Sequence, residues 1–327
     1  MFEPVVLTDL AIALRIGWFE VFRLPACYMV TLLLASRADN ASVNLHEAVV
    51  DLGGWEDSEN LQHGLLMRHS VRPVHLLLIE KLHIHADGID LIHEKETGTV
   101  SIVDPSEFNA CDKIINKYKK LDFILNTHHH ADHVGANLEF KKKYNSKILG
   151  SHADKNRIPG VDILLEENQK HKIGNLEFEV IFIPGHTNGH IAFFFKKEKI
   201  AFTGDTLFSL GCGRVFEGTH EEMFNSLNKI KNLPPDTKIY CGHEYTNSNL
   251  NFCLKHDPKN TRLKEKKIDI EKKLNSNQPT IPSTIADEIK TNIFLRCNDP
   301  EIKHGLGLKD SSDVEVFSKL RDLKDSF

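Results

Sequence analysis

Histidine and aspartate are concentrated in one short segment of the chain, Thr-His-His-His-Ala-Asp-His, at residues 127–133. Four of its side chains are candidate metal ligands: His128, His130, Asp132 and His133. The segment follows a short apolar run at 123–125 that predicts a strand, and a turn at its end can direct alternate side chains into one space. His129 lies between two candidates and is predicted to point away, with a structural role. Imidazole and carboxylate groups together suit Zn, Mn or Fe.

Three later segments repeat the pattern of a strand end, a glycine and a possible ligand. They read Pro-Gly-His-Thr, Gly-Asp-Thr and Gly-His-Glu, and their candidate ligands are His186, Asp205 and His243. In each segment the glycine lets the backbone turn tightly beside the ligand. The seven candidates are enough for two metal ions with Asp205 between them. They are too many for one tetrahedral structural zinc, and they include no cysteine.

The segments around these motifs predict an α/β domain followed by a helical one. Short apolar or β-branched runs predict strands at 99–103, 123–125, 148–149, 178–183, 191–195, 200–202 and 239–241. Ser106 is predicted to cap a helix that runs to Lys119, with Ile114 and Ile115 facing inward. Beyond Tyr245 the sequence has helical periodicity and no strand pattern.

Composition excludes several classes of protein. Hydrophobic residues make up 40% of the 327 residues and charged residues 27%, which is typical of a soluble globular protein and not of a fibrous or disordered chain. The net charge of −5 gives no overall basic field for nucleic acid. Six cysteines without a Cys-x-x-Cys pair indicate a reducing compartment, so we expect a cytoplasmic protein.

The first eighty residues differ in composition from the rest of the chain. Residues 1–80 contain no lysine, whereas residues 81–327 contain all 31 lysines. The first segment has five arginines and ten acidic residues, so it accounts for the whole net charge of −5. Three interpretations of this segment are open: an appended domain, a leader, and a coding artefact translated from upstream DNA.

The same segment is not predicted to cross a membrane. Its most apolar stretch, residues 24–35, is about twelve residues long, whereas a spanning helix needs about twenty. Glu3 and Asp9 occupy positions that are basic in a secretory signal, and a mitochondrial leader is poor in acidic residues.

The order of the motifs His-x-His-x-Asp-His, Pro-Gly-His-Thr, Gly-Asp-Thr and Gly-His-Glu-Tyr resembles the metallo-β-lactamase superfamily. Their flanking segments, THHHADHVGAN, IPGHTNGHI, FTGDTLFSLGCGR and YCGHEYT, are more similar still to the glyoxalase II (hydroxyacylglutathione hydrolase) family. The resemblance covers residues 95–327. It implies an α/β fold of the αββα metallo-β-lactamase-like sandwich type, with the metals at one edge and a C-terminal helical domain. On this basis we divide the chain into an unassigned segment 1–81, a catalytic domain 82–247 and a helical glutathione-binding domain 248–327.

The resemblance also assigns roles to individual residues. It implies one metal ion held by His128, His130 and His186, and a second held by Asp132, His133 and His243, with Asp205 bridging both. None of these seven positions departs from the family pattern. It further implies that glutathione contacts Arg214, Tyr245 and Arg296.

Two positions depart from the family. Phe216 stands where many relatives have tyrosine, which removes one hydroxyl contact. The Asp-Asn-Tyr stretch of the family's N-terminal strand is missing, and residues 82–93 stand in its place. Whether a first strand and its hairpin form is therefore open at this point.

The chemistry that the resemblance implies is thioester hydrolysis. Two divalent ions, zinc first and iron or manganese as alternatives, share a water and give a hydroxide at neutral pH. That hydroxide attacks the carbonyl of an S-(2-hydroxyacyl)glutathione such as S-lactoylglutathione, releasing glutathione and lactate. Asp132 and Asp205 are the catalytic candidates, because they position the ligands and share in proton transfer. The expected partner is the small-molecule glutathione thioester, with no nucleic acid and no membrane, and the expected state is a monomer.

Two other activities within the superfamily are the alternatives. A persulfide dioxygenase uses a single iron with fewer ligands and lacks the long helical C-terminus, so the seven ligands and Arg296 favour hydrolysis. Nucleases of the superfamily also carry His-x-His-x-Asp-His, and residues 255–273 are rich in lysine and arginine. We interpret that stretch as the solvated face of an amphipathic helix, with its apolar positions inward: Leu263, Ile268 and Leu274.

Overall fold

The computed structural model describes residues 77–84 and 87–327. Residues Val74–Phe327 form one compact unit. Residues 77–80, the end of the segment with the different composition, belong to the first strand of the fold. The rest of that segment, including the apolar stretch 24–35, lies outside the described residues. Within the described part of the chain, no helix is both long enough and apolar enough to cross a membrane.

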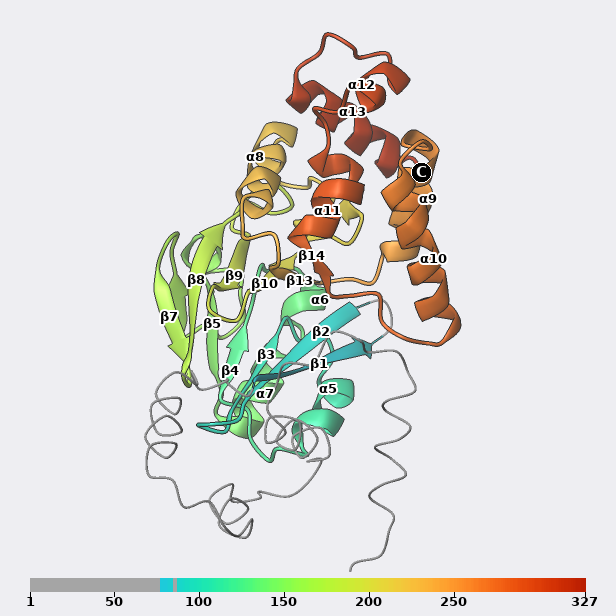
Figure 1. Cartoon of the computed structure of the whole chain (residues 1–327). Helices are drawn as coiled ribbons and strands as arrows, with labels where there is room; N and C mark the ends of the chain where they lie inside the picture. The colour runs from blue at the N-terminus through green and yellow to red at the C-terminus, as the bar shows by residue number, and fades with distance from the viewer. Residues whose placement is uncertain (1–76, 85–86) are drawn as a thin grey trace, which may run out of the picture. The chain divides into compact units, whose positions relative to one another are not determined.

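The first sheet has six strands in the order β1-β2-β3-β4-β5-β6 (Figure 1). They are β1 Leu77–Ile84, β2 Asp87–Glu94, β3 Thr99–Val103, β4 Phe123–Leu125, β5 Lys147–Ser151 and β6 Ile163–Leu165. β1 pairs with β2 in an antiparallel hairpin, so a first strand does form, and the predicted domain boundary after residue 81 falls inside it. β3 pairs antiparallel with β2, and β3 to β6 run parallel to one another.

The second sheet also has six strands, in the order β14-β13-β10-β9-β8-β7. They are β7 Lys170–Ile173, β8 Leu176–Phe182, β9 Ile191–Phe195, β10 Ile200–Gly204, β13 Lys238–Cys241 and β14 Ser283–Thr284. β8 and β10 are each antiparallel to β9, and β13 is parallel to β10, so β8, β10 and β13 run in one direction. A separate pair, β11 Leu207–Phe208 and β12 Gly211–Cys212, lies in the segment after β10.

Helices cover the outer faces of both sheets. They are α5 Phe108–Ile115, α6 Ala131–Val134, α7 Asn137–Tyr144, α8 His220–Lys231, α9 Thr246–His256, α10 Thr261–Asn275, α11 Ile285–Thr291, α12 Pro300–Gly305 and α13 Asp313–Asp325, with 3-10 turns η1 His152–Asp154 and η2 Ile293–Leu295. Figure 1 draws α9 to α13 in orange to red at the C-terminal end of the chain.

Three apolar clusters separate these layers. Between the sheets, Val103 of β3 packs with Phe193 and Phe202 of the second sheet. Ile102, the neighbour of Val103 in β3, points to the opposite face and joins the cluster under α5 and α7. A third cluster joins the second sheet to α8 and the C-terminal helices. β3, β9 and β10 are buried along their whole length because both of their faces are covered. This arrangement confirms the expected αββα sandwich with a C-terminal helical region.

The structure differs from the sequence expectation at the start of α5. The helix begins at Phe108, and its N-cap Glu107 makes no side-chain cap hydrogen bond, so the predicted cap at Ser106 is wrong. The backbone just before it is already engaged, because Asp104 N–H donates to Leu125 O and Pro105 O accepts from Ala136 N–H. The helix therefore begins only after this turn, and it ends at Ile115 instead of Lys119.

The inward face of α10 also differs from the expectation. Leu263 and Ile270 are buried and Leu274 is partly buried against the core, whereas Ile268 is 69% exposed. Positions seven apart return to nearly the same side of a helix, while Ile268 lies about 140° away from Leu263. The polar surface of α10 carries ion pairs such as Lys267–Glu271 and Lys273–Asp269, which supports a solvated face. A two-residue strand, β14, also lies beyond Tyr245, where no strand was expected.

Candidate metal centre

The seven candidate ligands follow the carboxyl ends of strands that run in common directions. They comprise His128 and His130 after β4, Asp132 and His133 in α6, His186 after β8, Asp205 after β10, and His243 after β13. The carboxyl ends of similarly directed strands meet at the same edge of a sheet. The structure brings all seven side chains together at that edge, where the two sheets adjoin.

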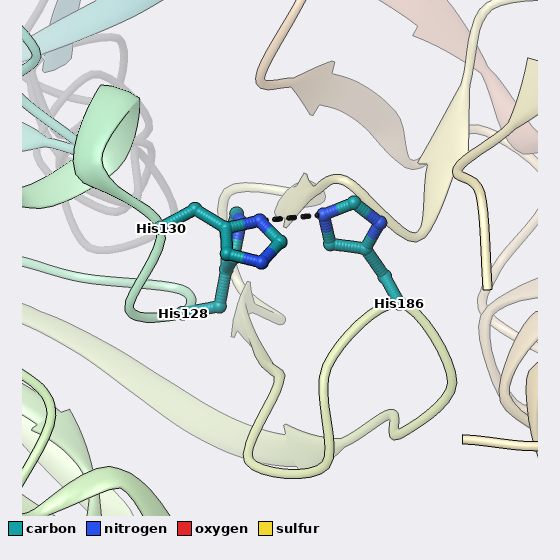
Figure 2. Close-up of side chains that lie close together, drawn as sticks. All are labelled: His128, His130 and His186. Carbon is teal, nitrogen blue, oxygen red and sulfur yellow. Dashed lines mark hydrogen bonds between the residues drawn. The ribbon is translucent and has the colours of Figure 1, made fainter. Parts of the chain in front are cut away.

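Three imidazoles form the first group of donors. His128 Nε2 lies 3.1 Å from His130 Nδ1, and His186 Nε2 lies 3.0 Å from the same atom. Figure 2 shows the rings of His130 and His186 pointing toward each other from two different loops. His128 and His186 are buried, and His130 is half-buried. Three ring nitrogens from two loops therefore converge on one point.

A carboxylate and two imidazoles form the second group. His133 Nε2 lies 3.3 Å from His243 Nε2, and Asp132 Oδ2 lies 3.5 Å from His243 Nε2. The Asp205 carboxylate lies between the groups. Its Oδ1 is 3.4 Å from His133 Nε2, while its Oδ2 is 3.1 Å from His243 Nε2 and 3.6 Å from His186 Nε2.

These distances fit divalent metal ions. A tetrahedral zinc with bonds of about 2.0–2.2 Å separates its ligand atoms by about 3.3–3.6 Å. Asp205 is only 6% exposed, and within residues 77–84 and 87–327 its Oδ1 has no hydrogen-bond partner. A buried carboxylate oxygen without a donor is costly unless a cation faces it. The donor atoms are nitrogen and oxygen, which suit zinc, iron or manganese.

The histidines of the first group favour the neutral form. Burial lowers the pKa of His128 well below its ordinary value, and the nearby His133 adds to the effect. Burial likewise lowers the pKa of His130 and of His186. A metal ion binds the lone pair of a neutral imidazole, so these three rings are in the state that ligation requires.

The second group favours positive charge. Burial opposes protonation of His133, but the carboxylates of Asp205 and Asp104 outweigh it and raise its pKa to about 9. Burial would raise the pKa of Asp205, yet His133 and His243 hold it well below its ordinary value. The carboxylates thus attract positive charge to the ring of His133. Either a proton or a metal ion can supply that charge at a ring nitrogen.

Several ligands are oriented by hydrogen bonds on their far side. His133 Nδ1 lies 3.0 Å from Asp104 Oδ2, and His186 Nδ1 donates to Arg214 O at 2.8 Å. Both bonds leave Nε2 of the ring facing the other donors. The backbone N–H of Asp205 donates to His190 Nε2 at 3.1 Å, and the His190 ring stacks on that of His128.

Asp104 and His190 were not identified from the sequence. Asp104 directly follows the strand β3 and precedes Pro105, so it lies at a strand end as the candidate ligands do. It also accepts hydrogen bonds from the backbone and the hydroxyl of Thr127, at 2.8 and 2.6 Å. His190 lies four residues after His186, within the quoted segment IPGHTNGHI.

Replacing Asp104 by alanine is expected to weaken metal binding by about 10- to 100-fold, because the ring of His133 loses the partner that orients it. Metal affinity measured by competition with a chromophoric chelator tests this expectation. Asp122→Ala is the control, since Asp122 also follows a loop of the first sheet but pairs with Lys120. Unchanged affinity in Asp104→Ala would show that His133 is oriented by other contacts.

Glycine is required beside the Asp205 carboxylate. A Cβ added at Gly242 would lie 2.5 Å from Asp205 Oδ1 and 2.7 Å from His133 Cε1. Both atoms belong to candidate ligands, so they cannot move aside without disturbing the centre. The glycine that precedes His243 therefore keeps space between the second group and Asp205.

His129 points away from the ligands, as predicted. Its Nδ1 lies 3.3 Å from Asp154 Oδ2, and its Nε2 lies 3.3 Å from Arg157 Nη1. Arg157 also pairs with Asp154 and with Glu217. This cluster joins the loop of His128 and His130 to the segment that contains Phe216.

The predicted substrate-contacting residues lie in different surroundings. Tyr245 is 41% exposed, and its ring stacks on that of His243 with centroids 4.9 Å apart. Phe216 is 62% exposed and lies edge-on to His130 and His186. The side chain of Arg214 is 61% exposed, and its Nε lies 3.5 Å from Asp325. Arg296 is 18% exposed and pairs with two carboxylates, those of Asp257 and Asp299.

Comparison with known proteins identifies similar families and relatives. Residues 117–243 match the family described as Metallo-beta-lactamase superfamily, and residues 244–327 match the one described as Hydroxyacylglutathione hydrolase C-terminus. A "Hydroxyacylglutathione hydrolase" of Pelagibacter ubique is 50% identical over 238 residues, 72% of this chain and 94% of that protein. One of the same description from Chelativorans is 45% identical over 256 residues, 77% of this chain and 99% of that protein.

A solved structure supports the fold. The crystal structure of ETHE1 from Myxococcus xanthus superposes with a TM-score of 0.55 at 21% sequence identity, covering 75% of this chain and 91% of that one. Identity at this level bears on the fold alone.

Proposed function

The chain belongs to the hydroxyacylglutathione hydrolase family of the metallo-beta-lactamase superfamily, and we propose that it hydrolyses S-(2-hydroxyacyl)glutathione, specifically S-lactoylglutathione, to glutathione and lactate. The observation that carries this proposal is the group of seven candidate ligand side chains, in which the buried carboxylate of Asp205 lies within 3.6 Å of the ring nitrogens of His133, His186 and His243. The family-specific helical region directly follows the last ligand, His243, and supports the same assignment.

We assign the donors to two divalent ions, with zinc as the first candidate and iron or manganese as alternatives. One ion would be held by His128, His130 and His186. The other would be held by Asp132, His133 and His243, with Asp205 between the two ions. Bound ions lower the pKa of a water from about 15.7 toward 7 and stabilise negative charge on the thioester oxygen. Asp132 and Asp205 position the ligands and share in moving the proton.

The residues of the chain then bind and orient the thioester. A water oxygen bonds to the carbonyl carbon, the C–S bond breaks, and the glutathione thiolate takes up a proton. The exposed guanidinium of Arg214 binds a glutathione carboxylate through charge-assisted hydrogen bonds. Tyr245 and Phe216 flank the centre on either side, each against a ligand ring. Tyr245 carries a hydroxyl group that can take part in hydrogen bonds, whereas Phe216 contributes apolar contact only.

The organisation of the whole protein follows from this assignment. We propose that residues 82–247 supply the metal centre, that residues 248–327 supply the helical wall of the glutathione site, and that the protein acts as a cytoplasmic monomer. The five cysteines within the described ranges are buried and none of them is in a disulfide, which supports a reducing compartment.

The direct test is hydrolysis of S-lactoylglutathione by the purified protein, followed through the loss of thioester absorbance. Oxygen uptake with glutathione persulfide is measured in parallel on the same preparation. Thioester hydrolysis without oxygen uptake is the expected result. Oxygen uptake without hydrolysis would instead assign the persulfide dioxygenase activity.

The two arginines predicted to contact glutathione should behave differently when replaced. Arg214→Ala is expected to raise KM about tenfold or more with kcat nearly unchanged, since one charge-assisted hydrogen bond contributes about 1.5–3 kcal/mol. Arg296→Ala should raise KM and also lower the melting temperature, because it breaks the pairs with Asp257 and Asp299. Arg262→Ala is the control, because Arg262 pairs with Glu265 on the exposed surface of α10.

Steady-state kinetics and thermal unfolding of the three variants separate these roles. An unchanged KM in Arg214→Ala would remove this residue from the glutathione site. A lower melting temperature with unchanged KM in Arg296→Ala would leave it a purely structural role between the helices.

A further inference from the structure

The segment Phe208–Gly213 connects the bridging ligand Asp205 to Arg214, and each of its six backbone carbonyls accepts a hydrogen bond from a side chain of the C-terminal helical region. We call this segment the connecting segment. Four side chains donate these hydrogen bonds. Asn292 donates to Phe208 O and Gly211 O, and Asn249 donates to Ser209 O. Cys253 donates to Leu210 O, and Arg321 donates to Cys212 O and Gly213 O.

These donors are buried in an otherwise apolar region. Asn249 and Arg321 are 4% and 3% exposed, and Asn292 is fully buried. The surrounding cluster consists of side chains such as Leu250, Phe294 and Phe317. Burying amide and guanidinium groups is costly unless they are hydrogen-bonded, and here the backbone of the connecting segment supplies the acceptors.

The end of the connecting segment touches the metal centre directly. A Cβ added at Gly213 would lie 1.9 Å from the backbone oxygen of Asp205 and 3.2 Å from His186 Nδ1. The next carbonyl, that of Arg214, accepts the 2.8 Å hydrogen bond from His186 Nδ1. A shift of the backbone at Gly213 therefore changes the position of Asp205 or the orientation of the His186 ring.

Arg321 of α13 holds this end of the segment. Its Nη1 donates to Cys212 O at 2.7 Å and to Gly213 O at 3.3 Å, while its Nη2 pairs with Asp325 at 3.0 Å. The guanidinium carbon lies 5.3 Å from the centroid of the Phe294 ring. One buried side chain thus fixes two successive carbonyls just before the carbonyl that orients His186.

We propose that Arg321 is a positioning residue for the metal centre: by holding the backbone of Cys212 and Gly213 it fixes the Arg214 carbonyl, and through it the ring of His186. The helical region would then contribute to metal affinity in addition to forming the substrate wall. This inference rests on the metal centre of the proposed function but not on the identity of the substrate.

The test compares Arg321→Met with Arg321→Lys and with Leu320→Ala. Leu320 is fully buried on the same helix, and its side chain has no donor for the connecting segment, so Leu320→Ala reports the cost of loosening α13 alone. For each variant the experiment measures Zn²⁺ affinity by chelator competition, the melting temperature without metal, and kcat and KM. Arg321→Met is expected to weaken Zn²⁺ binding by about 10- to 100-fold. Arg321→Lys keeps a charged donor group, so its Zn²⁺ affinity is expected to lie between that of Arg321→Met and that of the unmodified protein.

The pattern among the variants decides the proposal. A lower melting temperature with unchanged Zn²⁺ affinity is expected for Leu320→Ala, and the same pattern in Arg321→Met would overturn the proposal. Should Arg321→Met fail to fold, an unchanged affinity in Arg321→Lys would overturn it equally, and a reduced affinity would support it. An unmodified protein that binds Zn²⁺ but does not hydrolyse S-lactoylglutathione would refute the proposed function and leave this comparison intact.

Discussion

Replacing Asp205 by alanine is expected to abolish thioester hydrolysis and to release metal. Asp205 is the one side chain in the described ranges whose carboxylate lies within 3.6 Å of ring nitrogens from both donor groups. Under the proposed assignment, its removal would take away a ligand of both ions and the negative charge that faces them. Metal ions in such sites supply several kcal/mol of transition-state stabilisation, and losing that much lowers the rate by roughly 10³-fold or more.

Two measurements check this expectation, kcat with S-lactoylglutathione and the metal content of the purified variant. Asp112→Ala is a suitable control, because the Asp112 carboxylate is also well covered but pairs with Lys143 and Tyr144 in the first sheet's outer layer. The control is expected to keep both metal and activity. Normal turnover in Asp205→Ala would refute the two-ion interpretation of the centre.

The layout of this centre could be predicted because its ligands follow short strands. β4, β10 and β13 are short and mostly apolar, so their ends are visible in the sequence. A histidine or aspartate beside a glycine at such an end lies at the edge of the sheet where the carboxyl ends of similarly directed strands meet. The positions of His186 and Asp205 relative to His128 therefore followed from strand direction, although they are far apart in sequence.

The contacts that orient the ligands could not be predicted in the same way. Asp104 follows β3 as the ligands follow their strands, but only the register of β3 beside β4 places its carboxylate on His133. Arg321 contacts Cys212 across 109 positions of sequence, and no local pattern marks that pairing. The prediction that Ile268 faces inward was wrong for a similar reason, because tertiary packing determines which side of α10 meets the core.

Arg296 illustrates a further limit. The family resemblance assigns its guanidinium to the substrate. Asp299 is only three residues away, but the sequence gives no sign that Asp257, 39 residues away, also lies close enough to pair with it. A substrate carboxylate must therefore compete with two protein carboxylates for the same group. This competition is the physical reason why the kinetic and thermal effects of Arg296→Ala need to be measured together.

Removing metal with a chelator is expected to abolish hydrolysis completely while the protein stays folded. Small zinc domains unfold without their ion because metal binding supplies their folding free energy. Here the ligands are held by groups of the protein, since His133 contacts Asp104 and His186 donates to Arg214 O. The three apolar clusters around the sheets also do not depend on an ion.

The experiment follows activity, circular dichroism and melting temperature before and after chelation, and then after adding back Zn²⁺, Mn²⁺ or Fe²⁺. We expect unchanged secondary structure, a lower melting temperature and full loss of activity that at least one ion reverses. A ligand present at about 1,000 times its Kd stabilises the folded state by about 4 kcal/mol, so the melting temperature should recover with the same ion. Activity that survives complete removal of metal would contradict the proposed chemistry, whereas unfolding on chelation would show that Asp104 and the Arg214 carbonyl do not suffice to hold the ligands.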